Sequence, residues 1–222
     1  MIPRARMTRI REEHRVPPST DTDVLKADHK GVGLLLPTGG RLLWTISTPS
    51  LWRRRDGNLY INYEGVGGGV EEGESFEDAA IRECKEETGC VAQLESASRS
   101  FLIDEVMQRI GTTKVPGPSP VLVWRKRLLG GKTLLAYAFL ATLTGRPRPL
   151  AEVPALLYSP KRLITKRGTF TLRELLEGGS ELRARTSIPE SALVRPWGTP
   201  YYVGELVRRR MLEIPELPAP AA

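Results

Sequence analysis

The sequence predicts an α/β fold in which a mixed β-sheet is covered by helices. Short apolar stretches bounded by glycine and proline predict strands, and they alternate with a few segments that have helical periodicity. Hydrophobic residues make up 40% of the 222-residue chain and charged residues 27%, which is typical of a soluble globular protein. The length favours one domain with extensions.

Three strands are predicted before the first helix. Two apolar runs, residues 31–36 and 41–47, are separated by a glycine pair, which is typical of a β-hairpin. We interpret the basic segment that follows, residues 51–56, as a loop. Residues 59–63 form the third predicted strand, which leads into a glycine-rich stretch.

A helix is predicted over residues 76–88, because both of its ends carry capping signals. Ser75 is a candidate N-cap with Asp78 three residues further on, and Gly89 can adopt the left-handed conformation that ends many helices. One face of this helix carries Ala80, Ile81, Cys84 and Thr88. At about 100° per residue, the neighbouring face carries three glutamates: Glu83, Glu86 and Glu87.

The second half of the chain is expected to complete the sheet. The predicted strands lie within residues 91–103 and at residues 121–124, 133–143 and 153–158. Residues 125–127 are interpreted as a basic turn. A short helix is expected at residues 170–177 with Thr169 as its cap, and an arginine-rich helix at residues 201–212. Residues 180–200 are expected to be irregular.

Composition also bounds the surroundings of the protein. The longest apolar run, residues 134–141, is too short to span a bilayer, and the arginine-rich start lacks the apolar core of a signal peptide. Cys84 and Cys90 give no disulfide framework, so both are expected to pack as small hydrophobic residues. We therefore expect a cytoplasmic protein that does not bind membranes. The net charge of +7 favours polyanionic substrates and leaves contact with nucleic acid open.

The three glutamates of the predicted helix point to a divalent metal. Carboxylates at i, i+3 and i+4 positions repel one another, and a bound cation reverses that repulsion. Mg²⁺ prefers a few carboxylate oxygens and keeps some of its waters, so a phosphate can complete its coordination. The adjacent Gly67, Gly68 and Gly69 have no side chains and would let a phosphate or metal approach the backbone. An ordinary solvated acidic face is the alternative interpretation.

The spacing of these residues closely resembles the Nudix box. Gly68, Glu74 and residues 82–90 fill every polar and glycine position of that box. Cysteines occupy both aliphatic positions, and Val66 replaces the proline that often precedes the glycines. The resemblance implies a Nudix-type α/β/α sandwich with a mixed sheet. We expect that domain over residues 24–178, between an extended arm over residues 1–23 and an extension over residues 179–222 that contains a helix and a Pro/Ala tail.

The resemblance also implies site residues and a cofactor. The expected metal ligands are Glu83, Glu86, Glu87 and the backbone carbonyl of Gly68. Mg²⁺ is the expected ion, with Mn²⁺ as a substitute. Glu74 and Arg82 are expected to support the loop and the helix as an ion pair. The group that takes the proton from water is left open among four glutamates: Glu83, Glu86, Glu105 and Glu152.

The implied reaction is hydrolysis of a pyrophosphate bond in a nucleoside diphosphate linked to another moiety, or in a nucleoside triphosphate. Residues 104–109 contain neither the proline nor the tyrosine that marks particular Nudix subfamilies, so the substrate stays unidentified. Gly67, Gly69, Trp52 and Arg54 are the candidates for substrate binding. The alternative is a non-catalytic Nudix module that senses a nucleotide or binds nucleic acid. A homodimer is left open.

Overall fold

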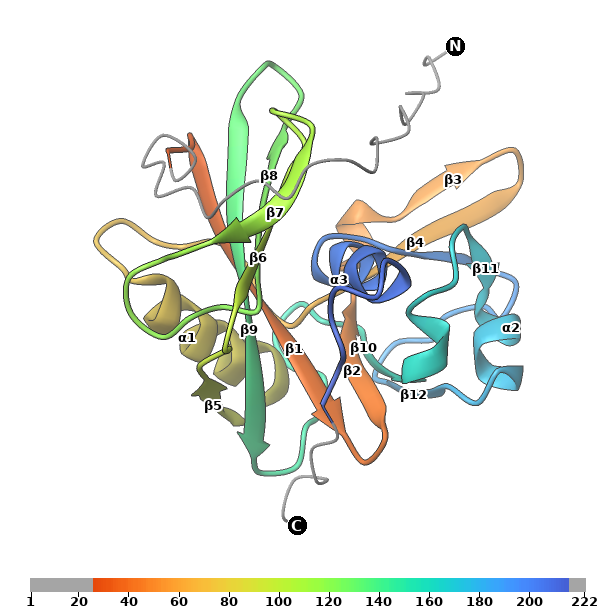
Figure 1. The fold of residues 1–222 in the computed structure, drawn as a ribbon. Coiled ribbons are helices and arrows are strands. Elements are labelled where there is room, and N and C mark those ends of the chain that lie inside the picture. The colour runs from red at the N-terminus through yellow and green to blue at the C-terminus, as the bar shows by residue number, and fades with distance from the viewer. Residues whose placement is uncertain (1–25, 216–222) are drawn as a thin grey trace.

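A computed structural model describes residues 26–215 of the chain (Figure 1). The arm expected over residues 1–23 and most of the expected Pro/Ala tail lie outside these residues. Within the described part lie three α-helices: α1 (Phe76–Thr88), α2 (Leu172–Glu177) and α3 (Thr199–Arg208). In residues 26–215, no helix has the length and apolar character that crossing a membrane requires.

Strand β1 (His29–Thr38) lies at the centre of a mixed sheet. It pairs in parallel with β9 (Thr133–Thr144) and antiparallel with β2 (Arg41–Ile46). The strands reached through β9 are β5 (Val91–Glu95), β6 (Ser100–Asp104), β7 (Arg109–Thr113) and β8 (Leu122–Arg127). The strands reached through β2 are β3 (Arg53–Arg55), β4 (Asn58–Glu64), β10 (Ala155–Pro160), β11 (Phe170–Thr171), β12 (Glu181–Ala184) and β13 (Leu193–Pro196).

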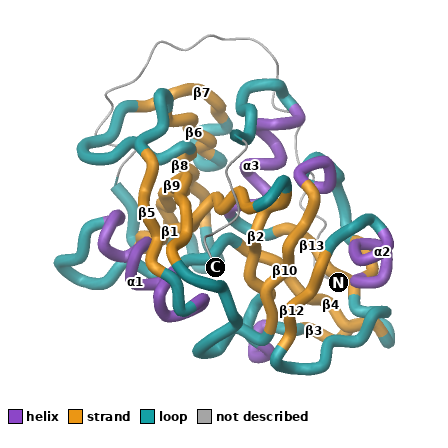
Figure 2. The backbone as a smooth tube through the Cα atoms, turned by 90° about the horizontal axis from the view of Figure 1, so that it is seen from below, coloured by secondary structure: helices purple, strands orange, loops and turns teal. Residues whose placement is uncertain are grey.

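Two hydrophobic clusters on opposite faces of β1 give the fold its layers. Leu34 and Leu36 belong to the cluster that contains α1, whereas Leu35 belongs to the cluster that contains Val203 and Leu206 of α3. Because successive residues of a strand face opposite sides, this alternation places one helix on each face. Figure 2 shows α1 outside the sheet and α3 between its two halves. The predicted α/β fold, with a mixed sheet between helices, is confirmed.

Helix α1 begins and ends where its sequence predicts. The hydroxyl of Ser75 accepts a hydrogen bond from the backbone N–H of Asp78 at 3.0 Å. Such an N-cap contributes about 1 kcal/mol. Gly89 ends the helix in the left-handed conformation at a φ of 72°. Ala80, Cys84 and Thr88 are fully buried, whereas Ile81, expected on the same face, is exposed. Ala80 and Cys84 pack in the cluster shared with β1, and this packing fixes the direction in which the glutamates of the helix point.

The glycine-rich stretch after β4 lies along the edge of β1. The backbone N–H of Leu34 donates to the carbonyl of Val66 at 2.8 Å, and that of Val32 donates to the carbonyl of Gly68 at 2.9 Å. The stretch therefore continues the sheet for a few residues, although it belongs to a loop. These backbone hydrogen bonds hold the glycines in one position beside α1.

Two basic segments differ from their predicted structure. Residues 51–56 are not simply a loop, because they include β3, which forms an antiparallel hairpin with β4. Asp56 and Gly57 connect the two strands with φ values of 50° and 75°. Positive φ at both central residues is the signature of a type I′ turn, which Asp-Gly favours. Residues 125–127 are not a turn either; they form the end of β8 and pair with β9.

The C-terminal region is more regular than expected. Thr171, rather than Thr169, caps α2, and it forms a capping box with Glu174. Residues 180–200, expected to be irregular, contain β12 and β13, and β13 pairs in parallel with β4. Helix α3 begins and ends a few residues earlier than the predicted span of 201–212. Strand β7 had no predicted counterpart.

Candidate active site

Glu87 is a half-buried carboxylate beside the glycine stretch. Its Oε2 accepts a hydrogen bond from the backbone N–H of Gly67 at 2.9 Å. Burial raises the pKa of Glu87 to about 8; the Gly67 hydrogen bond opposes this rise, whereas the charges of Glu83, Glu64 and Glu152 add to it. Within residues 26–215, the hydrogen bond to Glu87 comes from the Gly67 backbone, and no lysine or arginine forms an ion pair with its carboxylate. The charges of three other acidic residues thus act on a carboxylate that forms no ion pair within the described residues.

Glu83 lies against the backbone of Gly68. A Cβ atom at Gly68 would come within 2.5 Å of the Glu83 Oε1, so no larger residue fits while Glu83 keeps its position. Burial raises the pKa of the Glu83 carboxyl, while the hydrogen bond from Arg82 lowers it. The missing side chain at position 68 thus makes the space that the carboxylate occupies.

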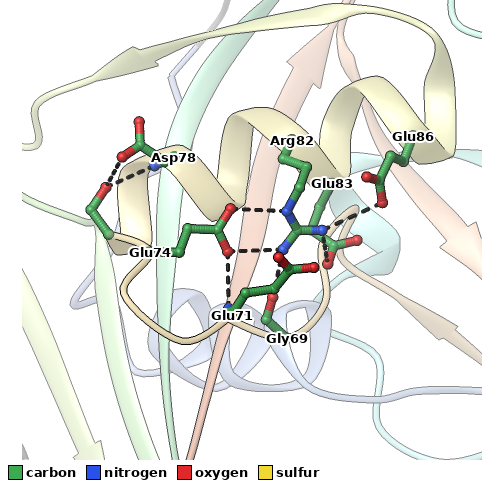
Figure 3. Close-up of polar contacts among 8 residues, drawn as sticks. Gly69, Glu71, Glu74, Asp78, Arg82, Glu83 and Glu86 are labelled. Atoms are coloured by element: carbon green, nitrogen blue, oxygen red, sulfur yellow. Dashed lines mark hydrogen bonds and ion pairs between the residues drawn. The ribbon is translucent and has the colours of Figure 1, made fainter.

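Arg82 lies between the glutamates, as Figure 3 shows. Its guanidinium holds Glu74 through two hydrogen bonds, at 2.9 and 3.0 Å. Its Nη1 donates to Glu83 Oε1 at 2.9 Å and to Glu86 Oε2 at 3.4 Å. Its Nη2 also donates to the carbonyl of Gly69 at 2.9 Å. Arg82 therefore connects the end of the glycine stretch, the loop at Glu74 and two consecutive turns of α1.

The expected metal ligands are not gathered around one point. Glu86 is about half exposed and its closest charged partner is Arg82. The carbonyl of Gly68 accepts a hydrogen bond from Val32, which leaves its second lone pair for another donor or ion. Among residues 26–215, no set of three histidine, cysteine, aspartate or glutamate side chains already converges closely enough to hold a metal. Rotation of glutamate side chains would be required.

The chemistry of the donors nevertheless fits a hard divalent cation. The charged groups that act on Glu87 are all carboxylates, and Mg²⁺ prefers oxygen ligands. Arg82 engages Oε1 of Glu83, and no described group bonds Oε2 of that carboxylate. A cation at this place would also remove the repulsion among carboxylates that raises the pKa of Glu87.

The remaining predicted residues are two candidate bases, Glu152 and Glu105, and two candidates for substrate binding, Trp52 and Arg54. Glu152 is exposed just before β10, and its charge acts on Glu87. Glu105 is exposed after β6, where it accepts a hydrogen bond from the hydroxyl of Tyr202 at 2.8 Å. Trp52 packs against the core and donates its Nε1 to the carbonyl of Ser47 at 2.7 Å. Arg54 is exposed on β3, on the same hairpin.

Sequence reasoning missed Glu64 and Lys126. Glu64 ends β4 immediately before the glycine stretch, and burial raises its pKa. An acidic residue between an apolar strand and three glycines is a signal that could have identified it. Lys126 is buried although it lies in a run of three basic residues, and nothing in that run distinguishes it from its neighbours.

Comparison with known proteins gives a family match. Residues 28–177 of the 222 match the family model described as the NUDIX domain. No curated protein matches the chain.

Solved structures of low identity also match. A NUDIX-family hydrolase from Clostridium perfringens is 17% identical, with 68% of this chain and 93% of that chain covered and a TM-score of 0.41. The ORF135 protein of E. coli is 20% identical, with 61% and 76% covered and a TM-score of 0.39. A MutT NUDIX hydrolase from Burkholderia pseudomallei is 22% identical, with 60% and 82% covered and a TM-score of 0.37. These scores are too low to add to the family match.

Proposed function

This chain belongs to the Nudix family, and from that premise we propose that it hydrolyses a pyrophosphate bond with the help of Mg²⁺ at the glutamates of α1. The proposed substrate is a nucleoside diphosphate linked to another moiety, or a nucleoside triphosphate. The observation that carries this proposal is the half-buried Glu87, on which the charges of three other acidic residues act and which forms no ion pair within residues 26–215.

Pyrophosphate hydrolysis requires charge neutralisation on two phosphates and an oriented water that loses a proton. Mg²⁺, when bound, supplies the neutralisation and lowers the pKa of a water. Glu83 and Glu87 would hold the ion, with Glu86 and the carbonyl of Gly68 as further ligands. The Gly67 N–H orients Glu87, and Arg82 takes one oxygen of Glu83 while leaving the other for the ion.

We propose that the proton acceptor is one of the acidic residues whose charges act on Glu87. The charges of Glu152 and Glu64 raise the pKa of Glu87, so both residues are candidates for the general base. Glu105 has less support, because it is bonded to Tyr202. Glu83 and Glu86 stay candidates as ligands that also act as bases.

One observation favours the alternative of a non-catalytic module. Arg82 already pairs with both Glu83 and Glu86, and an arginine that neutralises two proposed ligands would weaken metal binding. The two functions differ in whether a nucleotide incubated with the protein and Mg²⁺ is cleaved. A hydrolase releases products, whereas a sensor or a nucleic-acid binder leaves the nucleotide intact.

The test is a panel of nucleoside triphosphates and nucleoside diphosphate derivatives, incubated with the protein and Mg²⁺. Released phosphate is assayed after inorganic pyrophosphatase treatment of the triphosphates and after phosphatase treatment of the diphosphate derivatives. We expect at least one member to be cleaved, and Glu83→Gln and Glu87→Gln each to lower turnover by at least about 100-fold, because ligand loss removes several kcal/mol of charge stabilisation. Glu95→Gln, at an exposed glutamate on β5, is the matched control and should cleave normally. No cleavage of any member, together with salt-sensitive binding of RNA or DNA, would instead support the non-catalytic alternative.

A further inference from the structure

A cavity of about 540 Å³ lies on the α3 side of the sheet. Its walls come from the end of β8, from residues 164–169 and from the junction between β13 and α3. Half of the lining residues lie beyond residue 177, where the match to the family model ends. The volume is within the range of pockets that take small ligands. This cavity is therefore a feature of this chain that the family match alone does not describe.

Lys126 is the most unusual group in the cavity wall. Its side chain is buried, with 7% of the residue exposed. Its ammonium lies 3.4 Å from the centre of the Trp197 ring and 5.6 Å from that of Trp124. It forms no hydrogen bond or ion pair within the described range of 26–215, and the charges of Glu105 and Glu64 act on it only from beyond ion-pair distance. A buried ammonium without an acceptor is costly, and an anion entering the cavity would supply the missing partner.

The whole cavity carries a surplus of positive charge. One acidic residue, Glu105, lines it, and that carboxylate accepts a hydrogen bond from Tyr202. The cations in the wall are Lys126, Arg127, Lys166, Arg167, Arg195 and Arg208. Even after Arg167 and Arg208 are paired with the neighbouring Glu205, cations outnumber acids. Such a wall favours a phosphate over a neutral or cationic group.

An aromatic surface accompanies the charge. Trp197 lines the cavity with 44% of the residue exposed, an unusual exposure for so large an apolar side chain. Flat rings stack on exposed tryptophan, and each stacked base contributes about 1–3 kcal/mol in proteins that bind single-stranded nucleic acid. A ligand with a flat ring and a phosphate matches both features of the wall.

The cavity adjoins the acidic site. The backbone N–H of Trp197 donates to the carbonyl of Tyr63 at 2.9 Å, one residue before Glu64. Thr199 packs on Gly65, where a Cβ atom would come within 2.8 Å of the threonine Cβ. Both contacts lie within a few residues of Gly67, whose N–H holds Glu87. One small molecule could therefore reach the cavity and the glutamates together.

We infer that this cavity binds the nucleoside phosphate end of the substrate, with a phosphate at Lys126 and the base against Trp197. The inference rests on the proposed hydrolysis for the identity of the substrate, but binding in the cavity needs no metal. It assigns substrate selection to residues of β8, β13 and α3, while the glutamates of α1 act on the adjoining pyrophosphate.

The test is calorimetric titration of the full chain in EDTA with AMP, GMP, CMP and UMP, compared with adenosine and ribose 5-phosphate. We expect at least one mononucleotide to bind about 10-fold more tightly than either fragment, because only it has both ring and phosphate. Trp197→Ala and Lys126→Gln should each weaken that binding by about 10-fold or more, whereas Trp197→Phe, which keeps a ring, should weaken it by less. Lys132→Gln, at an exposed lysine outside the cavity, is the matched control. Circular dichroism of each variant shows whether it is folded.

The outcomes separate this inference from the proposed function. Mononucleotide binding that Trp197→Ala and Lys126→Gln leave unchanged would overturn the inference, as would equal binding of ribose 5-phosphate. Hydrolysis without any binding in EDTA would overturn it too, while the proposed hydrolase would stand. Glu87→Gln should still bind the mononucleotide, and binding lost in that variant alone would place the nucleotide elsewhere. Binding as expected with no hydrolysis of any panel member would reject the hydrolase and keep the cavity.

Discussion

Two clusters of charge in this protein are built from the same residue types in opposite proportions. In the first, Arg82 lies among Glu74, Glu83 and Glu86 at helix α1. In the second, Glu205 of α3 lies among three arginines, with Arg209 at 2.7 Å, Arg167 at 3.1 Å and Arg208 also in contact. In each cluster a single residue contacts three residues of the opposite charge, and we call it the minority residue.

The difference between the clusters determines what each can attract. At α1 the surplus charge is negative, and within residues 26–215 the nearby Glu87 is hydrogen-bonded to the Gly67 N–H and not to a cation. At α3 the surplus is positive, and within the same residues the nearby Lys126 forms no ion pair, although the charges of Glu105 and Glu64 act on it. A metal ion suits the first place and a phosphate suits the second, and a metal-dependent hydrolase of nucleotides needs both. Arg82 and Glu205 each hold the oppositely charged side chains around them in place without neutralising the excess charge of the cluster.

After the substitutions of Glu83 and Glu87 themselves, the largest effect is expected at Gly68, on the acidic side. In Gly68→Ala the new Cβ would displace the Glu83 carboxylate, which is the end of a flexible side chain, so the fold should persist. Misplacing a catalytic group by about 1 Å can cost about 100-fold in rate, and we expect turnover to fall by about 10- to 100-fold. Steady-state kinetics and a thermal melt measure the two effects. Gly111→Ala, where no atom lies within 4 Å of the added Cβ, is the control. Full turnover in Gly68→Ala would show that the position of Glu83 does not matter.

A smaller effect is expected at Arg82, the minority residue of the same cluster. Arg82→Lys keeps the charge but cannot make the two parallel hydrogen bonds to Glu74. We expect roughly 10-fold weaker apparent Mg²⁺ affinity, since residues that orient metal ligands typically contribute 10- to 100-fold. The Mg²⁺ dependence of the rate measures this affinity, with Arg99→Lys at an exposed arginine as the control. Tighter Mg²⁺ binding in Arg82→Lys would show that Arg82 competes with the ion rather than positioning its ligands.

The smallest effect is expected at Glu205, the minority residue of the basic cluster. Burial opposes ionisation of Glu205, but hydrogen bonds from Arg208 and Arg209 outweigh it and hold its pKa below the usual value. Because the pKa is lowered in the folded state, its stabilising contribution is complete above the unfolded value of about 4.3 and is lost as the pH falls through the folded value. Glu205→Gln should therefore lower the free energy of unfolding at pH 7 by about 1 kcal/mol, a modest value because the arginines are partly exposed.

Urea unfolding at pH 7 and at acidic pH tests this expectation. The difference between wild type and Glu205→Gln should shrink as the pH falls below about 4. Glu177→Gln, at an exposed glutamate of α2, is the control. A difference that grows on acidification would contradict the lowered pKa.

The acidic cluster was far easier to predict from the sequence than the basic one. Helix α1 carries its own caps at Ser75 and Gly89, and the glutamates on it are close in sequence as well as in space. The basic cavity instead joins β8, residues 164–169 and α3, which no local pattern connects. Lys126 looked like part of a solvated turn, because the tryptophan that covers it lies 71 positions further along the chain. The β3–β4 hairpin was predictable from Asp56-Gly57, and that signal was overlooked.

The packing of Thr199 has a consequence for chimaeric proteins. This threonine begins α3 and rests on both Gly33 of β1 and Gly65 of the glycine stretch, where a Cβ at either position would collide with it. Transplanting the C-terminal helix into another member of the family would therefore fail wherever that recipient has a larger residue at either site. Recipients with glycine at both positions are the ones into which the substrate preference of this chain could be grafted.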